Sequence, residues 1–313
     1  MDFRLTEDQQ ALKRGVRELL AARFGREALR AAVDAGGVLD RALWRELGAA
    51  GFFALRLPEA ADGVGLGLPE AVLVFEEAGR ALLPGPLVAT HLAAGRVPGA
   101  AEGEAVVARA DGELVEWLDT ADAVLGDATG AVPMRSVDPL TPLHRLPGGP
   151  APAGADTASP LTPPHRLPGG PAPAEADTAS LLTAAEQLGS AARTTELAVA
   201  YARVREQFGQ PIGAFQAVKQ LCAQMLVRTE VARAAVYAAA VTADPVEIAG
   251  ARLLADEAAA GCARDCLQVH GGMGFTWEAD VHLHLKRAWV RAGRGLGGAV
   301  AEERVAAALE PAP

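Results

Sequence analysis

The sequence predicts a mainly α-helical protein with three parts: an N-terminal helical domain, a shortened β region in the middle, and a C-terminal four-helix bundle. Half of the 313 residues are hydrophobic, mostly Ala, Leu and Val, and few are aromatic. This composition is typical of packed helices, and the length suffices for two or three domains. Apolar residues recur at helical spacing over residues 1–100 and 181–313, whereas the residues that follow position 100 form short β-like runs.

The N-terminal domain, residues 1–100, is predicted to consist of helices. Thr6 and Gln9 fit a capping box before the run "ALKRGVRELLAARF", and "DRALWRELGAAGFFAL" and "LPEAVLVFEEAGRALL" are further helical segments. The stretch "PEAADGVGLGLP" between the last two is Gly-rich. It lacks the preceding strand of a phosphate-binding loop, so we interpret it as an ordinary loop.

The middle region, residues 101–180, begins with short β-like runs that are broken by Asp-Gly and Thr-Gly turns. A tandem duplication follows, in which residues 139–159 are repeated as 160–180 with two differences, Leu143/Pro164 and Gly154/Glu175. Two copies are too few for a solenoid, and the Pro and Gly content disfavours regular helix. We expect the duplication to form a surface loop or linker, with a partner-binding segment as the alternative.

The C-terminal domain, residues 181–313, is predicted to be a bundle of antiparallel helices. Thr183 and Glu186 fit a second capping box, and a helix is expected from there to about Glu206, broken at Gly209-Gln-Pro211. Further helices are expected over about 214–242, 245–269 and 278–292, with a shorter one at the end. The short connections between them predict antiparallel neighbours.

Charge and composition exclude several classes of function. The net charge is −10 and no Lys/Arg-rich run occurs, so nucleic acids and anionic membranes are poor partners. No apolar run reaches the roughly 18–20 residues that a bilayer span needs, and the start of the chain carries no apolar signal segment. Cys222, Cys262 and Cys266 are too few for a disulfide framework or zinc site. We expect a soluble, cytoplasmic protein with reduced thiols.

Two stretches at predicted helix ends carry the functional signal. In "VREQFGQPIGAFQAVKQ", Arg205 directly precedes the helix break, where it either complements the helix dipole or presents a guanidinium to a phosphate. In "QVHGGMGF", three glycines follow a helix end. Helix termination explains one or two of them, and a third indicates close approach of the backbone to a ligand.

Taken together, "REQFGQPIGAFQAVK" and "QVHGGMGFTWEADVHLHLKRA" resemble the C-terminal domain of the acyl-CoA dehydrogenase family. The segment "LWRELGAAGFFALRLPEAADGVGLGLPEAVLVFEEAGRALLPGPL" resembles the N-terminal domain of that family. The likeness covers roughly residues 1–100 and 181–292. The likeness of the C-terminal part rests on two motifs that occur together, and their combination is more specific than either motif alone.

The resemblance implies FAD as cofactor. It implies that Arg205 contacts the FAD diphosphate, that Gln216 also meets FAD, and that Gln268, Gly271 and Gly272 hold the adenosine end, typically across a subunit interface. Gln207 and Phe208, inside the first motif, are included among the expected cofactor-binding residues. The implied reaction is α,β-dehydrogenation of an acyl-CoA thioester, in which a carboxylate removes the α-proton and the β-hydrogen leaves as hydride to the flavin.

The sequence departs from the family pattern at the catalytic base, so the catalytic residue is not identified. The usual Glu position falls near Gly295, where the chain reads "WVRAGRGLGG". Glu278, Asp280 and Glu186 are weak candidates, because helix capping is the better explanation of each of them. The Thr/Ser-rich strands with which the family holds the flavin ring are also missing. We expect no metal site, since His282 and His284 do not share a helix face.

These features predict an acyl-CoA dehydrogenase subunit that needs a homologous partner subunit, in a hetero-oligomer of the kind known among actinobacterial steroid and fatty-acid catabolic enzymes. Electron-transfer flavoprotein or a similar acceptor would take the electrons. Two alternatives stay open: an active homo-oligomer with a relocated base, and a non-catalytic structural or regulatory subunit.

Overall fold

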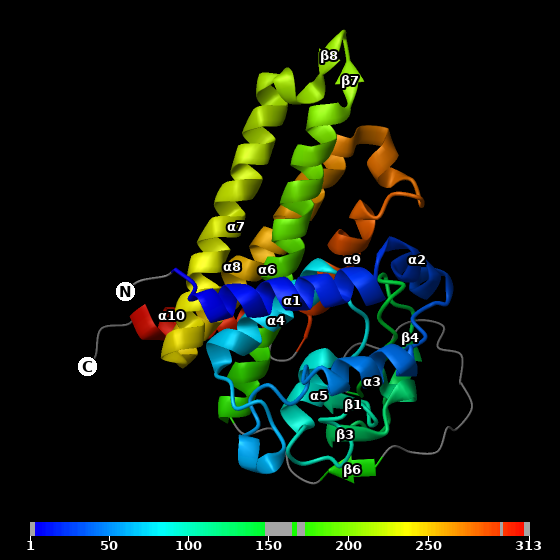
Figure 1. The fold of residues 1–313 in the computed structure, drawn as a ribbon, viewed down its shortest axis with the longest axis vertical. Helices are drawn as coiled ribbons and strands as arrows, with labels where there is room; N and C mark the ends of the chain where they lie inside the picture. Colours follow the sequence, from blue (N-terminus) through cyan, green and yellow to red (C-terminus); the bar gives the residue numbers. More distant parts are fainter. Residues whose placement is uncertain (1–3, 148–164, 168–172, 295–296, 310–313) are drawn as a thin grey trace.

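The computed structural model describes residues 4–147, 165–167, 173–294 and 297–309. Three long helices, α6, α7 and α8, stand side by side as the upright body of the molecule, and helix α1 crosses them (Figure 1). Strands β1, β3 and β6 lie at the lower end of the molecule, near α3 and α5, whereas β7 and β8 lie at its upper tip (Figure 1). The expected mainly helical fold is therefore confirmed.

The N-terminal helices are α1 (Glu7–Arg23), α2 (Arg26–Asp34), α3 (Arg41–Ala49), α4 (Leu68–Arg80) and α5 (Leu87–Ala93). The predicted capping box at the start of α1 is confirmed. The Thr6 hydroxyl accepts a hydrogen bond from the Gln9 N–H at 3.2 Å, and the Gln9 side chain accepts one from the Thr6 N–H at 3.1 Å. Each satisfies a backbone donor that the first helical turn leaves free.

The described strands of the middle region and of the duplication form two small sheets. In the first, β1 (Val107–Ala110), β3 (Ala123–Gly126) and β6 (His165–Leu167) pair in parallel. In the second, β5 (Leu143–Arg145) lies between β2 (Leu114–Glu116) and β4 (Val132–Met134), antiparallel to both. The Asp-Gly turn after β1 therefore leads from one sheet to the other and does not close a hairpin.

The expectation that the duplication, residues 139–180, forms a loop or linker is wrong for part of its length. The His-Arg-Leu of the first copy contributes to β5, that of the second copy forms β6, and helix α6 already begins at Pro173. Proline is tolerated there because the first residue of a helix has no partner for its N–H. Residues 148–164 and 168–172 of the duplication lie outside the described residues.

Helix α6 (Pro173–Val204) thus starts ten residues before the predicted capping box at Thr183. Thr183 lies inside the helix, and its hydroxyl donates to the carbonyl of Ala179 at 2.9 Å. The capping interpretation of Thr183 and Glu186 is therefore wrong. The local pattern was misleading because a Thr or Glu can satisfy itself inside a helix as well as at its end.

The remaining helices are α7 (Gln216–Thr242), α8 (Pro245–His270), α9 (Val281–Ala292) and α10 (Gly297–Leu309), with the 3₁₀ turn η4 (Gly271–Phe275) after α8. Asp244 caps α8 by accepting from the N–H groups of Val246 and Glu247. Since α7 runs opposite to α6 and α8, the end of α6, the start of α7 and the end of α8 all lie at one end of the bundle (Figure 1).

One hydrophobic core continues from the N-terminal helices into the bundle. Its tightest point is the crossing of α4 and α6 at Gly79 and Gly189, where a Cβ built on Gly189 would lie 1.9 Å from the carbonyl oxygen of Glu76. Glycine is required there because the two backbones touch. Within the described part of the chain, no helix is both long and apolar enough to cross a membrane.

Candidate functional site at the end of the bundle

Arg205 lies at the tip of the molecule, directly after the last residue of α6. Its N–H still bonds to the carbonyl of Tyr201 at 2.9 Å, and its own carbonyl accepts from the N–H of Ile212 at 2.7 Å. Between these bonds the chain makes the hairpin β7 (Glu206–Gln207) and β8 (Gln210–Pro211). The side chain of Arg205 is exposed, and among the described residues it has no hydrogen-bond or ion-pair partner.

The turn of this hairpin depends on backbone conformation. Phe208 and Gly209 both have positive φ, 53° and 80°, as the two-residue turns that match strand twist require. Phe208 is 92 % exposed, and its ring meets that of Phe215 edge to face at 6.0 Å between centroids. Among the described residues, Phe208 is the most exposed of the large hydrophobic side chains.

The glycine corner after α8 lies at the same end of the bundle. Tyr201, in the last turn of α6, stacks on His270, the last residue of α8, with ring centroids 4.1 Å apart. Gly271 then takes φ 58° and ψ −140°, a backbone conformation open to glycine. A Cβ added to Gly271 or Gly272 would meet no atom within 4 Å, so the backbone here faces open space.

We call this end, formed by Arg205, Gln216, Gln268, Gly271 and Gly272, the bundle-end corner. All five of these residues are exposed. The fold brings them to one end of the bundle although Arg205 and Gly271 are far apart in sequence. Gln216 is the first residue of α7 and Gln268 lies in the last turn of α8. Gln207, by contrast, bonds through its side chain to the carbonyl of Glu206 within the hairpin.

The bundle-end corner fits an anionic ligand that has a polar body. A free guanidinium suits a phosphate, exposed glycine backbone permits close approach, and two amide side chains supply further donors and acceptors. These residues would hold the diphosphate and adenosine part of a dinucleotide. Along α6, Arg205 lies roughly 37 Å from Ser180, at a rise of about 1.5 Å per residue. A phosphate bound at Arg205 is therefore out of reach of the residues around Ser180.

Of the weak candidates for a catalytic base, Glu186 is the most deeply buried. Its side chain is 1 % exposed and lies between Arg291, at 3.0 Å, and Arg294, at 2.5 Å. Burial alone would raise the pKa of Glu186, but the charges of Arg291 and Arg294 outweigh it and hold that pKa below its usual value. A carboxylate neutralised by two guanidinium groups is a poor proton acceptor, and its place in the structure is that of an ion-pair partner.

The other two candidates lie near the start of α9. Asp280 forms ion pairs with Arg26 at 2.6 Å and with Arg30 at 3.1 Å, which connect α9 to α2. The expected capping of the next helix by the Asp280 side chain is wrong, because that side chain makes no cap hydrogen bond. Glu278 is exposed. Gly295, near the usual position of the base, lies outside the described residues.

The two histidines of α9 point into different surroundings. His284 is buried, and its Nδ1 lies 2.7 Å from the Ser190 hydroxyl. His282 stacks on Trp277 at 5.1 Å between ring centroids. In the described residues no group of three or more His, Cys, Asp or Glu side chains could hold a metal ion. Cys262 and Cys266 are buried and Cys222 is half-buried, and all three are free thiols.

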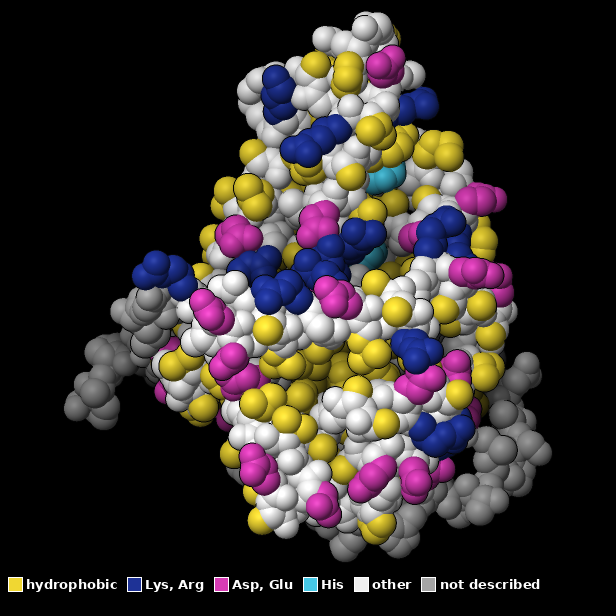
Figure 2. Space-filling view, in the orientation of Figure 1, with side chains coloured by type: hydrophobic (Ala, Val, Ile, Leu, Met, Phe, Trp, Pro, Cys, Tyr) yellow, Lys and Arg dark blue, Asp and Glu magenta, His cyan; other side chains and the backbone are white. Residues whose placement is uncertain are grey.

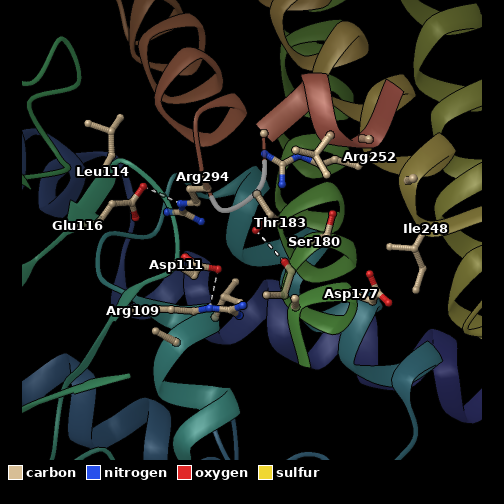
Figure 3. Close-up of a pocket in the computed structure, with 18 of the residues that line it drawn as sticks. Arg109, Asp111, Leu114, Glu116, Asp177, Ser180, Thr183, Ile248, Arg252 and Arg294 are labelled. Carbon is tan, nitrogen blue, oxygen red and sulfur yellow. Dashed lines mark hydrogen bonds and ion pairs between the residues drawn. The ribbon is translucent and has the colours of Figure 1, made fainter. Parts of the chain in front are cut away.

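A pocket at the opposite end of the bundle was not anticipated from the sequence. We call it the Arg109 pocket. It lies between the strands β1 and β2, helix α5 and the starts of α6, α8 and α10 (Figure 3). Its apolar walls include Leu87, Val88, Leu114, Ala179, Ile248 and Val300. Arg294 and Gly297, which flank the expected position of the base, also line it.

Three of the four arginines in this pocket make side-chain hydrogen bonds to carboxylates, and the fourth, Arg109, forms an ion pair with Asp111. Arg252 bonds to Asp256 at 2.8 Å, Arg294 bonds to Glu116 at 2.6 Å and to Glu186, and Arg304 bonds to Asp177 at 2.5 Å. Figure 3 shows the fourth, Arg109, entering from the strand side opposite Ser180 and Thr183 of α6. No sequence pattern pointed to it, because the pocket is assembled from six separate elements.

Comparison with known proteins identifies the class to which this fold belongs. The chain matches the family model "Acyl-CoA dehydrogenase, N-terminal domain" over residues 6–101 and "Acyl-CoA dehydrogenase, C-terminal domain" over residues 177–304. It is 38 % identical over 313 residues to the acyl-CoA dehydrogenase IpdE2 of Mycobacterium tuberculosis, covering 90 % of this chain and 91 % of that protein. The chain belongs to the acyl-CoA dehydrogenase family, as the resemblance of its motifs predicted.

A further relative and two solved structures are also similar to the chain. It is 34 % identical to the acyl-CoA dehydrogenase FadE34 of the same organism, over 82 % of this chain but 40 % of that longer protein. A chain of the ChsE4–ChsE5 complex from Mycobacterium tuberculosis superposes with a TM-score of 0.80 at 26 % identity, covering all of both chains. A chain of the Tcur3481–Tcur3483 steroid ACAD, in its G363A variant, gives 0.79 at 25 % identity over 96 % of this chain and 97 % of that one.

Proposed function

We propose that this chain is an FAD-dependent acyl-CoA dehydrogenase subunit that works in an assembly with a homologous subunit. The observation that supports the proposal is the bundle-end corner. The guanidinium of Arg205, which has no partner among the described residues, and an open glycine backbone lie at the same exposed end of the bundle, where Tyr201 stacks on His270. Arg205 would bind the FAD diphosphate, and Gln268, Gly271 and Gly272 the adenosine end.

The flavin ring and the base would come largely from elsewhere in the assembly. When bound, FAD supplies the hydride acceptor for α,β-dehydrogenation of an acyl-CoA thioester. The candidates Glu186 and Asp280 of this chain are both neutralised by arginines, so the α-proton needs a carboxylate of the partner. The Arg109 pocket would receive the acyl group, because Arg294 and Gly297, on either side of the expected base position, line it. Since this pocket and Arg205 lie at opposite ends of the bundle, the flavin beside the acyl group would belong to a second FAD, held mainly by the partner subunit.

Features of the surface and of the relatives support a partner subunit. Phe208, Phe275 and Trp277 are exposed around the bundle-end corner, at 92 %, 74 % and 51 %. Large apolar side chains at the tip of a bundle are typical of protein interfaces. The solved structures that this chain resembles include a complex of two differently named subunits, ChsE4 and ChsE5. A role in the catabolism of steroids or fatty acids, with an electron-transfer flavoprotein or similar acceptor, forms part of the proposal.

Replacing Arg205 by Ala in the purified complex tests the proposal. The loss of charge-assisted hydrogen bonds to the diphosphate should weaken FAD binding roughly ten- to a hundred-fold. Arg203→Ala is the matched control, since Arg203 is also an exposed arginine of the last α6 turn. The measurement is an FAD titration with flavin absorbance after size-exclusion chromatography. Equal FAD affinity in the two variants contradicts the assignment of Arg205, and full dehydrogenation by the chain alone contradicts the need for a partner.

A non-catalytic structural subunit is the second candidate, because the buried and half-buried carboxylates Glu186 and Asp280 serve as ion-pair partners. It predicts unchanged FAD content and rate for Arg205→Ala in the complex. An active homo-oligomer would instead require Glu278, the exposed acid among the three candidates, to act as base, and Glu278→Gln would then abolish turnover by the chain alone.

A further inference from the structure

The Arg109 pocket contains a buried cation whose hydrogen-bonding capacity is mostly unused. Arg109 is 7 % exposed, and its Nε lies 2.7 Å from Asp111 Oδ2 in an ion pair without hydrogen-bond alignment. Within the described part of the chain, neither Nη1 nor Nη2 has a hydrogen-bond partner. Leaving buried donors unpaired is costly, and each such group calls for an explanation.

The surroundings make a structural role for these two donors a poor explanation. The other arginines of the pocket, Arg252, Arg294 and Arg304, each reach a carboxylate with good hydrogen-bond geometry. Arg109 is held by its Nε side, which leaves the planar Nη fork directed into the pocket opposite Ser180 and Thr183 (Figure 3). A fixed fork of this kind matches an oxygen acceptor on a ligand.

The rest of the wall limits what such a ligand can be. Leu87, Val88, Ile248 and Val300 form the apolar part of the wall. The charges of Arg252, Arg294 and Arg304 are each balanced by a carboxylate, so a ligand body of hydrocarbon fits this part of the pocket. A plain hydrocarbon chain would bury the fork without satisfying it. A hydrocarbon body with an oxygen function at the position of Arg109 removes that penalty.

We propose that the Arg109 pocket selects acyl groups that carry a ketone or carboxylate oxygen distant from the thioester, with Nη1 and Nη2 of Arg109 as the donors. This inference rests on the proposed function, in that it takes the pocket as the acyl site. Arg109 is a specificity-determining residue here and takes no part in the transfer of the proton or hydride.

The test compares three CoA esters with the same six-carbon backbone on the purified complex: hexanoyl-CoA, 5-oxohexanoyl-CoA and adipoyl-CoA. Dissociation constants are measured by calorimetry without turnover. The two oxygen-bearing esters should bind roughly ten- to a hundred-fold more tightly than hexanoyl-CoA. Preference for the keto ester over the dicarboxylic ester, or the reverse, identifies which oxygen function the fork accepts.

Arg109→Met should abolish this preference while leaving the affinity for hexanoyl-CoA unchanged or higher. Arg109→Lys is the second variant, because it keeps a cation beside Asp111 for folding but lacks the planar fork, and it should reduce the preference partly. Arg304→Met is the matched control: it removes an arginine of the same pocket that is already paired with Asp177, and it should keep the preference.

Equal affinity of the complex for all three esters overturns the inference, and so does a preference that survives in Arg109→Met. In either case FAD binding that depends on Arg205 would leave the proposed function standing. A complex that binds neither FAD nor any CoA ester would overturn both.

Discussion

At the scale of single residues, the structure is governed by buried charges and their partners. Glu186 lies between Arg291 and Arg294, and Glu76 is held by Lys13 and Arg233 at 2.5 Å each. Removal of one member of such a pair leaves the other buried and uncompensated, which typically costs 3–5 kcal/mol, a rough figure. Glu186, the most deeply buried of the three acids that the sequence offers as catalytic candidates, is therefore committed to structure.

His284 makes stability depend on pH. Burial, with the charges of Arg193 and Arg291, lowers the pKa of His284 to about 3 from the ordinary value of 6.5. As pH falls below 6.5, the unfolded chain takes up a proton at this residue while the folded chain does not, so stability is lost between pH 6.5 and about 3. Between pH 7 and pH 5 this single residue should cost about 2 kcal/mol.

Urea unfolding at pH 7 and pH 5 checks the effect of His284. Between pH 7 and pH 5, the unfolding free energy of His284→Gln should fall by about 2 kcal/mol less than that of the unsubstituted protein. His282→Gln, on the same helix but half-buried, is the control and should change the decrease less. An identical pH dependence in His284→Gln and the unsubstituted protein would show that His284 does not stay neutral in the fold.

At the scale of elements, the crossing of α4 and α6 determines how the N-terminal helices sit on the bundle. Gly79 and Gly189 occupy the contact, and a Cβ on either would come within about 2 Å of the opposite backbone. The clash is with backbone atoms, which cannot turn aside as a flexible side chain can. The two helices would have to separate, and the core shared by the two regions would open with them.

Gly189→Ala should therefore lower the unfolding free energy by about 3 kcal/mol or more, although Ala is the better helix former. Gly15→Ala is the matched control, because Gly15 lies inside α1 with no atom within 4 Å of an added Cβ. That variant should gain about 0.5–1 kcal/mol. Denaturant unfolding measures both, and a stabilising effect of Gly189→Ala would show that the helices do not cross this closely.

At the scale of the whole molecule, the outer face of α7 is apolar and uncovered. Val227, Val231 and Val241 are 61 %, 49 % and 62 % exposed, and they repeat at helical spacing on one side of the helix. Figure 2 shows hydrophobic side chains lying between basic and acidic ones over the upper part of the molecule, where α7 stands. Such a stripe along one helix is typical of a subunit interface.

The paired substitution of Val227 and Val231 by Lys tests whether the proposed assembly with a second subunit uses this face of α7, and it should break that assembly. Burying two ammonium groups against an apolar partner is costly, so the mass in analytical ultracentrifugation should fall toward that of the single chain. Val38→Lys is the control, since Val38 is 67 % exposed in the N-terminal region, away from α7. An unchanged mass for the paired variant would place the interface on another face.

Much of the element content was predictable because its causes are local. The cap at Thr6 and the glycines after α8 act within a few residues, and the helical spacing of apolar residues is independent of distant contacts. The start of α6 was misplaced because its first turns lie in a Pro-rich duplication. The local composition there favours a loop, but the packing of α6 on its neighbours outweighs this local preference.

The sequence by itself determined the family, the helical character of both ends and the two motifs at the bundle end, since a motif is a property of neighbouring residues. Only the tertiary structure decided that those motifs lie at the same end of the bundle and that Glu186 is an ion-pair partner. It also decided that Arg109 enters a pocket with two donors that have no hydrogen-bond partner among the described residues. Each of these depends on which distant segments lie side by side. That is set by the burial of the shared core, whose contacts join residues far apart along the chain.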